Sequence, residues 1–198
     1  MDYQGAKEYI LNRLSKELPA KRTYHSFEHT MDVYSTVIDI GEKEGVTGED
    51  MELLKLAALY HDCGFIVQDH DHEIAGCRIM KEKLIDLGYS EEATKKVCSM
   101  VMCTKIPQSP KTLLERIICD ADLDYLGRND FFLIGDTLFE ELKVYGVLKT
   151  LDEWNEIQVK FLEAHSYCTE TNRTSRTEKK AENLQRVKDL LANKKARS

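Results

Sequence analysis

Apolar residues recur at helical spacing along almost the whole chain of 198 residues. In residues 26–44, Met31, Tyr34 and Ile38 share one helical face, and Gly45 follows as a stop signal. The pattern predicts an all-α fold, a helical bundle of about eight or nine helices. The expected helices cover residues 4–18, 26–44, 49–62, 73–87, 90–103, 112–118, 129–145, about 150–162, and 176–193.

No internal repeat, low-complexity tract or long linker divides the chain. The length suits one domain, and three prolines with ten glycines favour long helices over many short strands. We therefore expect a single domain over residues 1–198. Its core should cover about 20–165, with a basic C-terminal helix over 171–195 docked on it.

The net charge of −7 is unevenly distributed. Residues 171–198 contain nine Lys and Arg and three acidic residues, a net charge of +6, so residues 1–170 carry −13. An acidic body disfavours nucleic acid as a partner. In the basic segment, Leu184, Val187 and Leu190 lie at helical spacing, which favours a docked helix over an arm that binds polyanions.

The cysteines and the chain start indicate the cellular environment. The six cysteines include no CxxC pair, and the first ten residues, MDYQGAKEYI, show no signal-peptide pattern. No stretch approaches the roughly eighteen apolar residues of a membrane span. We expect a cytoplasmic protein without membrane contact, whose cysteines are reduced and act as small buried residues.

Three groups of metal-ligand-type side chains lie at predicted helix ends. His25 and His29 are four residues apart, His61 and Asp62 end the apolar run LLKLAALYHDCG, and acids alternate over 120–124. Each group alone has an ordinary explanation as surface histidines, a capped helix end with a satisfied core histidine, or an acidic turn. An imidazole and a carboxylate at the end of an apolar helix are nevertheless costly to bury unless paired or metal-bound.

Taken together, the three groups favour one common site. Helices of a bundle can bring side chains from three helix ends to one interior point. Two imidazoles and two carboxylates form a mixed N/O set that suits a divalent transition metal or magnesium. Open coordination positions for water or substrate would make such a site catalytic. We also expect Gly64 to end the middle helix in a left-handed conformation.

The order of these motifs resembles the HD superfamily of metal-dependent phosphohydrolases, an all-helical family with the order H…HD…D. The resemblance covers roughly residues 20–130. The family pattern favours Asp122 over Asp120, because the family's acid follows a small residue and precedes an apolar-polar pair such as Leu-Asp. The resemblance implies one divalent metal ion (Mn, Mg, Fe, Co, Ni or Zn) with the ligands His29, His61, Asp62 and Asp122.

The resemblance also implies roles beside the metal ligands. The cyclic-nucleotide phosphodiesterase branch has a general-acid histidine four residues before the first ligand, and His25 occupies that position. Imidazole suits this task because it titrates near neutral pH. For binding substrate phosphate, the candidates are His72, Lys105 and Arg128.

Two-metal members of the superfamily carry a further histidine in the region where this chain reads VMCTK, residues 101–105. Its absence favours a single metal ion. The role of His70 stays open between substrate contact and surface loop. We expect His165 to pack structurally near the C-terminal helices.

The predicted activity is hydrolysis of a phosphoester or phosphoanhydride by metal-activated water. His25, Asp62 and Asp122 would be catalytic, and the small phosphorylated substrate is expected to be a nucleotide. The alternative is a non-catalytic metal- or nucleotide-binding regulatory HD domain. An HD-fold oxygenase would need further His or Asp ligands. Exposed apolar residues on the terminal helices allow either a homodimer or a monomer.

Overall fold

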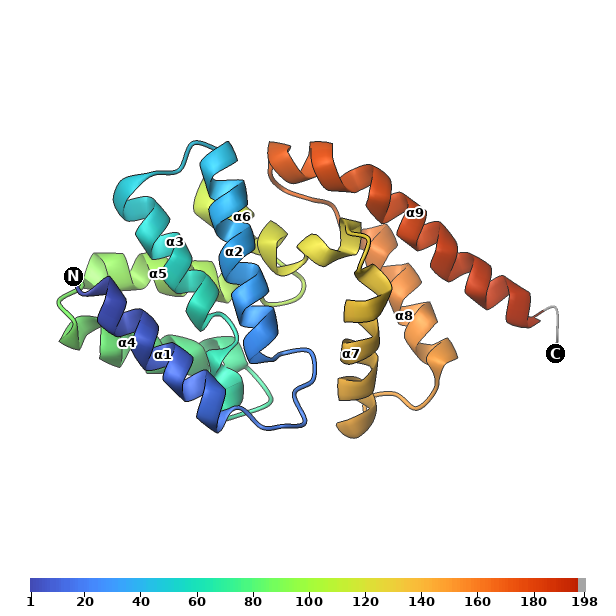
Figure 1. Ribbon diagram of the computed structural model, residues 1–198, viewed down its shortest axis with the longest axis horizontal. Helices are drawn as coiled ribbons and strands as arrows, with labels where there is room; N and C mark the ends of the chain where they lie inside the picture. Colours follow the sequence, from blue (N-terminus) through green and yellow to red (C-terminus); the bar gives the residue numbers. More distant parts are fainter. Residues whose placement is uncertain (196–198) are drawn as a thin grey trace. The chain divides into compact units, whose positions relative to one another are not determined.

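The computed structural model describes residues 1–195, and within that range it contains α-helices and two short 3-10 helices but no strand. The all-α fold and the expected number of helices are confirmed (Figure 1). The elements are α1 (Tyr3–Glu17), α2 (Phe27–Lys43), α3 (Gly48–Tyr60), η1 (Cys63–Ile66), α4 (His72–Asp86), α5 (Glu91–Cys103), α6 (Leu113–Asp122), η2 (Asp124–Gly127), α7 (Phe131–Val144), α8 (Leu151–Ala164) and α9 (Glu170–Lys195).

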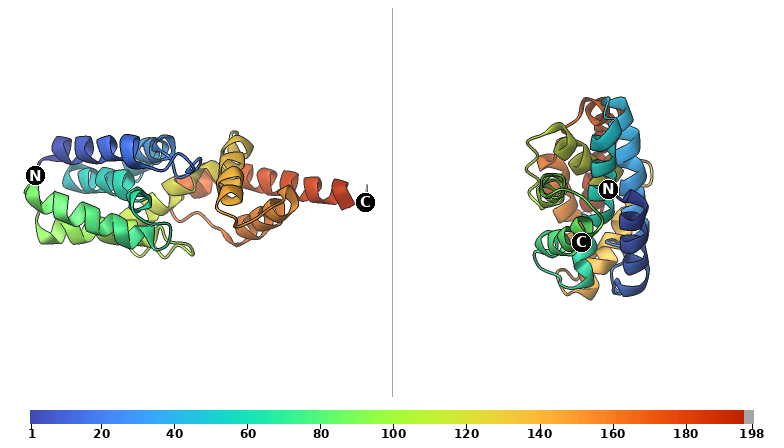
Figure 2. Two further views of the ribbon diagram at one scale, coloured as in Figure 1. Left: turned by 90° about the horizontal axis from the view of Figure 1, so that it is seen from below. Right: turned by 90° about the vertical axis from the view of Figure 1, so that its left-hand side faces the viewer.

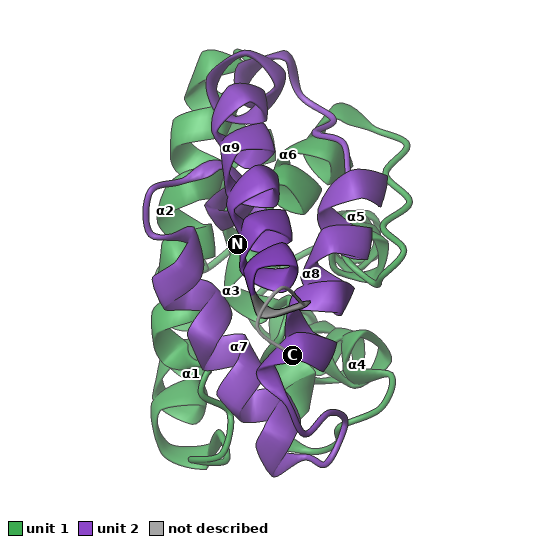
Figure 3. Ribbon diagram, turned by 90° about the vertical axis from the view of Figure 1, so that its right-hand side faces the viewer, with its two compact units in different colours: residues 1–122 green, residues 123–198 purple. Residues whose placement is uncertain are grey.

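The chain forms two compact units, residues 1–122 and 123–198 (Figure 3). The first unit contains α1 to α6 with η1, and the second contains η2 and α7 to α9. The expectation of a single domain over the whole chain stays a prediction. Within the described residues, every helix is too short or too polar to cross a membrane.

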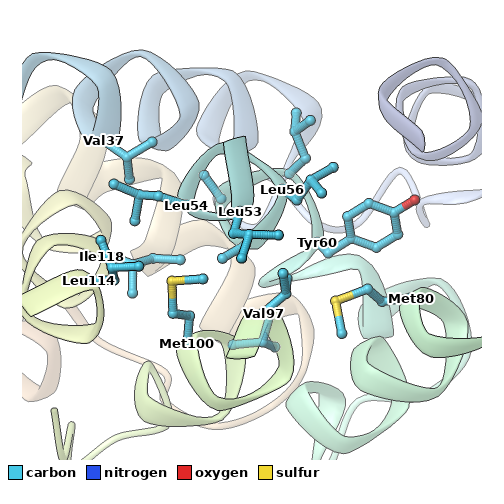
Figure 4. Close-up of a cluster of buried hydrophobic side chains, with 14 of the residues drawn as sticks. Val37, Leu53, Leu54, Leu56, Tyr60, Met80, Val97, Met100, Leu114 and Ile118 are labelled. Atoms are coloured by element: carbon cyan, nitrogen blue, oxygen red, sulfur yellow. The ribbon is translucent and has the colours of Figure 1, made fainter. Parts of the chain in front are cut away.

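Helix α3 is the centre of the first unit, between α1 and the pair α4 and α5 (Figure 2). From Leu53 to Tyr60, every residue except Lys55 is buried. A helix that is apolar on all sides must be surrounded by other helices. Val37 of α2 and Met100 of α5 belong to the side chains that enclose it (Figure 4). The end of α3, which leads into the His-Asp pair, is therefore held from several sides.

Local signals set the boundaries of the helices beside α3. The Ser26 hydroxyl accepts a hydrogen bond from the backbone N–H of His29 at 3.2 Å, so α2 begins directly after Ser26. Gly45 follows the end of α2 with φ +78°, a conformation that favours glycine. The expected helix start at Ser26 and stop at Gly45 are both confirmed.

The expectation that Gly64 ends α3 in a left-handed conformation is wrong. Gly64 lies within η1 and has no positive φ. Close packing requires glycine here, because a Cβ atom would lie 1.8 Å from the carbonyl oxygen of His72. The missing side chain lets the start of α4 approach the turn after Asp62. Among the described residues, the non-glycine residue with positive φ is Asp71, directly before α4, with φ +52°.

The cysteines also differ from the expectation of six reduced thiols. Cys77 of α4 and Cys98 of α5 form a disulfide, with their Cα atoms 5.4 Å apart. The two helices pack side by side, which brings together cysteines that are 21 residues apart in sequence. No short cysteine spacing could signal this pairing. The free thiols are Cys63, Cys103 and Cys119, which are buried, and Cys168, which is half-buried.

In the second unit, α9 packs on η2 and α8. Asp124 of η2 is 2% exposed, and it accepts hydrogen bonds from Arg176 Nε at 2.8 Å and Asn172 Nδ2 at 3.0 Å. Lys180 Nζ donates to the carbonyl of Leu162, in the last turn of α8, at 3.2 Å. Because basic side chains of α9 bond within their own unit, the docked-helix interpretation is favoured over a polyanion-binding arm.

Helix α6, which ends at Asp122, begins with a capping box whose glutamate, Glu115, is buried. Thr112 Oγ1 accepts from the N–H of Glu115 at 3.3 Å, and Glu115 Oε2 accepts from the N–H groups of Thr112 and Lys111 at 2.9 and 2.7 Å. Ser99 Oγ donates to the other carboxylate oxygen. Burial opposes ionisation, but these hydrogen bonds outweigh it and hold the pKa of Glu115 below its ordinary value.

We expect Glu115→Gln to lower the free energy of unfolding by about 2 kcal/mol at pH 7, because the amide cannot replace the charge-assisted bonds. A carboxylate with a lowered pKa stabilises the folded state above its ordinary pKa and loses that contribution as the pH falls. The difference from the parent protein in urea unfolding should therefore shrink as the pH falls below about 4.3.

Glu153→Gln is the matched control, because Thr150 and Glu153 form the same capping box at α8 with an exposed side chain. Glu153→Gln should lower the free energy of unfolding less than Glu115→Gln does. Equal losses of unfolding free energy in the two variants, or a Glu115→Gln difference from the parent that grows as the pH falls, would contradict the stabilising role of ionised Glu115.

Candidate metal centre

Four ligand-type side chains converge where three helices of the first unit begin or end. His29 lies in the first turn of α2, His61 and Asp62 directly follow α3, and Asp122 is the last residue of α6. All four side chains are largely buried, with exposed fractions from 1% for His61 to 14% for Asp122. The three sequence groups thus meet at one point, as expected from the motif spacing.

The nitrogen and oxygen atoms of the cluster face one another closely. The Nε2 atoms of His29 and His61 are 3.3 Å apart. Asp62 Oδ2 lies 3.1 Å from His61 Nε2 and 3.6 Å from His29 Nε2. Asp122 Oδ1 lies 3.3 Å from His29 Nε2 and 3.6 Å from His61 Nε2. These separations are typical of atoms that share an ion at about 2.0–2.2 Å.

The surroundings of the Asp62 carboxylate indicate whether a cation fits the cluster. Its Oδ2 atom is buried, and among the described residues no donor meets it in hydrogen-bonding geometry. An unsatisfied buried carboxylate oxygen is costly. His61 Nδ1 donates to the carbonyl of Ala58 at 2.8 Å, which leaves Nε2 as a lone-pair donor toward the cluster. The donor set and the unsatisfied oxygen both fit a divalent cation.

Electrostatics agree with this fit. Burial lowers the pKa of His61, but the charges of Asp62 and Asp122 outweigh burial and raise this pKa to about 9. Burial raises the pKa of Asp62, but His61 and His72 hold it well below its usual range. A histidine with a raised pKa beside a carboxylate with a lowered pKa marks a place where positive charge is favoured.

Asp122, and not Asp120, belongs with His29 and His61 to the group of side chains whose ligand atoms all lie within 4.8 Å of one another. Asp62 lies outside this group, although its Oδ2 is 3.1 Å from His61 Nε2 and 3.6 Å from His29 Nε2. Asp120 is buried in α6.

Gln108 Nε2 donates to Asp122 Oδ2 at 3.3 Å and to the carbonyl of Cys119 at 3.1 Å, so Gln108 orients the Asp122 carboxylate. No sequence signal marks Gln108 beyond its place between two prolines. Ligation by Asp122 itself stays a prediction.

Three aromatic rings lie beside the cluster. His25 precedes α2, and its ring centroid is 6.3 Å from that of His29. The ring of Phe65 lies 4.5 Å from that of His25 and stacks on His72 at 3.8 Å. His72 Nε2 is 3.3 Å from Asp62 Oδ1. The structure thus brings both histidines to the site, whereas no sequence signal marks Phe65, because only its contacts reveal its role.

Lys105 and His70 lie at the exposed border of the site. Lys105 Nζ pairs with Asp71 Oδ1 at 2.5 Å, and Asp71 directly precedes His72. His70 is exposed in the same loop. Lys105 is thus connected to the loop that positions His72, while phosphate binding by Lys105 stays a prediction and the role of His70 stays open.

Arg128 belongs to the second unit, where carboxylates engage its guanidinium. Its Nη2 lies 2.8 Å from Asp130 Oδ2, and its Nη1 lies 3.7 Å from Asp124 Oδ2. These pairs give Arg128 a structural task, and its role in substrate binding stays a prediction. His165 packs against Phe161, with ring centroids 6.1 Å apart, as expected for a structural histidine.

The family model of the HD domain matches residues 26–124, half of the chain. The chain belongs to the HD domain family. The matched range includes His29, His61, Asp62 and Asp122, so the resemblance to this family is confirmed, while the roles of these residues stay a prediction. Comparison with curated proteins finds no significant match.

Two solved structures share the fold of this HD protein. One is a predicted HD superfamily hydrolase from an uncultured Thermotogales bacterium, with a TM-score of 0.61 and 20% identity over 94% of this chain and 91% of that one. The other is YpgQ of Bacillus subtilis, in complex with ADP, with a TM-score of 0.65 and 15% identity over 97% of each chain. At these identities, the likeness concerns the fold.

We expect the protein to bind about one divalent ion per chain, and His61→Ala to lose nearly all of it, because this side chain supplies the most buried ligand. His29→Ala and Asp122→Ala should weaken Mn²⁺ binding at least tenfold, on the order of known effects at metal sites. Elemental analysis after dialysis against Mn²⁺ measures the content. His70→Ala, an exposed histidine, is the control. Unchanged metal content in all three cluster variants would overturn the ligand assignment.

Proposed function

We propose that this HD protein is a metal-dependent phosphohydrolase that cleaves a phosphoester or phosphoanhydride of a small phosphorylated substrate. The observation that carries the proposal is the approach of the Asp62 and Asp122 carboxylates to the two imidazoles at 3.1–3.6 Å, where Oδ2 of Asp62 lacks a hydrogen-bond donor. Membership in the HD family supports it. The name of the Thermotogales relative, a predicted HD superfamily hydrolase, points the same way.

His29, His61, Asp62 and Asp122 would hold one divalent ion, of which Mn, Mg, Fe, Co, Ni or Zn suits the donor set. When bound there, such an ion lowers the pKa of a coordinated water toward neutrality and polarises a phosphoryl oxygen. The protein's own carboxylates at Asp62 and Asp122 would orient the attacking water. Gln108 fixes the direction of Asp122 through its amide hydrogen bond.

His25 would donate a proton from a ring nitrogen to the leaving oxygen. Its ring lies against Phe65, which also stacks on His72, so one apolar ring keeps both histidines beside the cluster. His72 and Lys105 would bind phosphoryl oxygens by charge and hydrogen bonding. Such positioned charges account for most of the acceleration of phosphoryl transfer.

A nucleotide is the substrate class that we favour. The Bacillus subtilis relative of similar fold was solved in complex with ADP. The acidic body of the chain, with −13 over residues 1–170, argues for a small substrate over nucleic acid. A cytoplasmic location and a homodimer stay predictions.

We expect inorganic phosphate release from at least one nucleotide when the protein is screened against nucleotides and sugar phosphates with Mn²⁺, Mg²⁺, Co²⁺ and Ni²⁺. The activity should disappear in His61→Ala, which separates it from contaminating phosphatases. Nucleotide binding without phosphate release under any metal would instead favour the non-catalytic regulatory domain.

His25→Ala should retain its metal content and reduce kcat by roughly 10²–10⁴-fold, the usual contribution of a general acid. The loss should be smallest for substrates with a good leaving group, because these need least proton donation. The measurement is steady-state kinetics on the substrate from the screen, with His70→Ala as control. Full activity of His25→Ala on every substrate would remove His25 from the mechanism.

A further inference from the structure

A second pair of cysteines lies in the first unit, apart from the disulfide. Cys103 is the last residue of α5, Cys119 lies in α6, and their Sγ atoms are 3.4 Å apart. Cys119 Sγ also donates to the carbonyl oxygen of Cys103 at 3.3 Å. Disulfide sulfurs are about 2.05 Å apart, so an approach of about 1.4 Å would join this pair.

Helix α5 thus carries two cysteines, each directed at a cysteine of a different neighbouring helix. Cys98 is bonded to Cys77 of α4, and Cys103 lies against Cys119 of α6. His72, the first residue of α4, borders the candidate metal centre, and Asp122, the last residue of α6, belongs to it. The cysteine pairs therefore connect the helices that position the site.

The Cys119 side of the pair is directly coupled to Asp122. The two residues are three positions apart in the same helix, and one amide nitrogen, Nε2 of Gln108, donates to both the Cys119 carbonyl and the Asp122 carboxylate. A displacement of α6 at Cys119 moves both acceptors relative to this nitrogen. The shared donor therefore links the position of Cys119 to the carboxylate of Asp122.

We propose that Cys103 and Cys119 are an oxidisable dithiol, which hydrogen peroxide converts to a disulfide that weakens metal binding through Asp122. Cys103, 5% exposed against 0% for Cys119, reacts first. Its sulfur attacks one peroxide oxygen, the O–O bond breaks, and the thiol proton leaves with the departing hydroxide as water. Cys119 sulfur then attacks the resulting sulfenic acid and displaces the second water.

The balance is two thiols and one peroxide to one disulfide and two waters. Two electrons and two protons pass from the protein to the peroxide, and a dithiol reductant reverses the change. The effect on metal binding rests on the proposed function of the site, whereas the oxidation itself does not.

Peptide masses test the oxidation directly. After trypsin digestion without reduction, residues 97–105 carry both Cys98 and Cys103, residues 56–78 carry Cys77, and residues 117–128 carry Cys119. The full-length protein treated with hydrogen peroxide should yield all three peptides joined, and the untreated protein only the first two. Cys119→Ser should never yield the three-peptide species, while Cys168→Ser, a half-buried cysteine of the second unit, should behave like the parent.

Mn²⁺ binding, followed by electron paramagnetic resonance, tests the coupling without any hydrolysis. Peroxide should weaken Mn²⁺ affinity about tenfold in the parent and in Cys168→Ser, reversibly with dithiothreitol, and leave Cys119→Ser and Cys103→Ala unchanged. The absence of the three-peptide species would overturn the dithiol. Its formation with unchanged Mn²⁺ affinity would overturn the coupling. Failure of the reduced parent to bind any metal would refute the proposed function, while the peptide masses still decide the dithiol.

Discussion

The buried carboxylate of Asp62 is the constraint on which the site depends. It follows a helix whose last eight residues are almost entirely buried, so water cannot satisfy its charge. One of its oxygens is met by His72, and the other faces two imidazole nitrogens without a hydrogen bond. A cation is the chemical partner that satisfies such an arrangement. The raised pKa of His61 has the same origin, because the surrounding carboxylates favour positive charge at this point.

The scaffold around Asp62 works by close approach of helix ends. The absent side chain of Gly64 allows α4 to begin against the turn that follows α3. Later in the chain, the capping box that contains buried Glu115 begins α6. Gln108 donates a hydrogen bond to the carboxylate of Asp122, the last residue of that helix. Because each ligand sits at a helix terminus, its position depends on caps and turns as much as on packing of the helix bodies.

Helix α5 contributes no candidate ligand, yet it contacts α6, which ends at Asp122, and α4, which begins at His72 beside the site. Its cysteines meet those of α4 and α6, and its Ser99 bonds the capping glutamate of α6. Changes at α5 therefore reach Asp122 by two routes. In the second unit, Arg176 and Lys180 of α9 bond to η2 and α8, which favours a docked helix over a polyanion-binding arm.

The sequence by itself determined the helices, because apolar periodicity and caps such as Ser26 are local signals. It also predicted that His29, His61, Asp62 and Asp122 come together, since they stand at helix ends in an order that resembles the HD family. Tertiary structure alone decided what depends on contacts between distant segments. The role of Gly64, the Cys77–Cys98 bond and the Gln108 bond to Asp122 follow from helix packing, which no local spacing encodes.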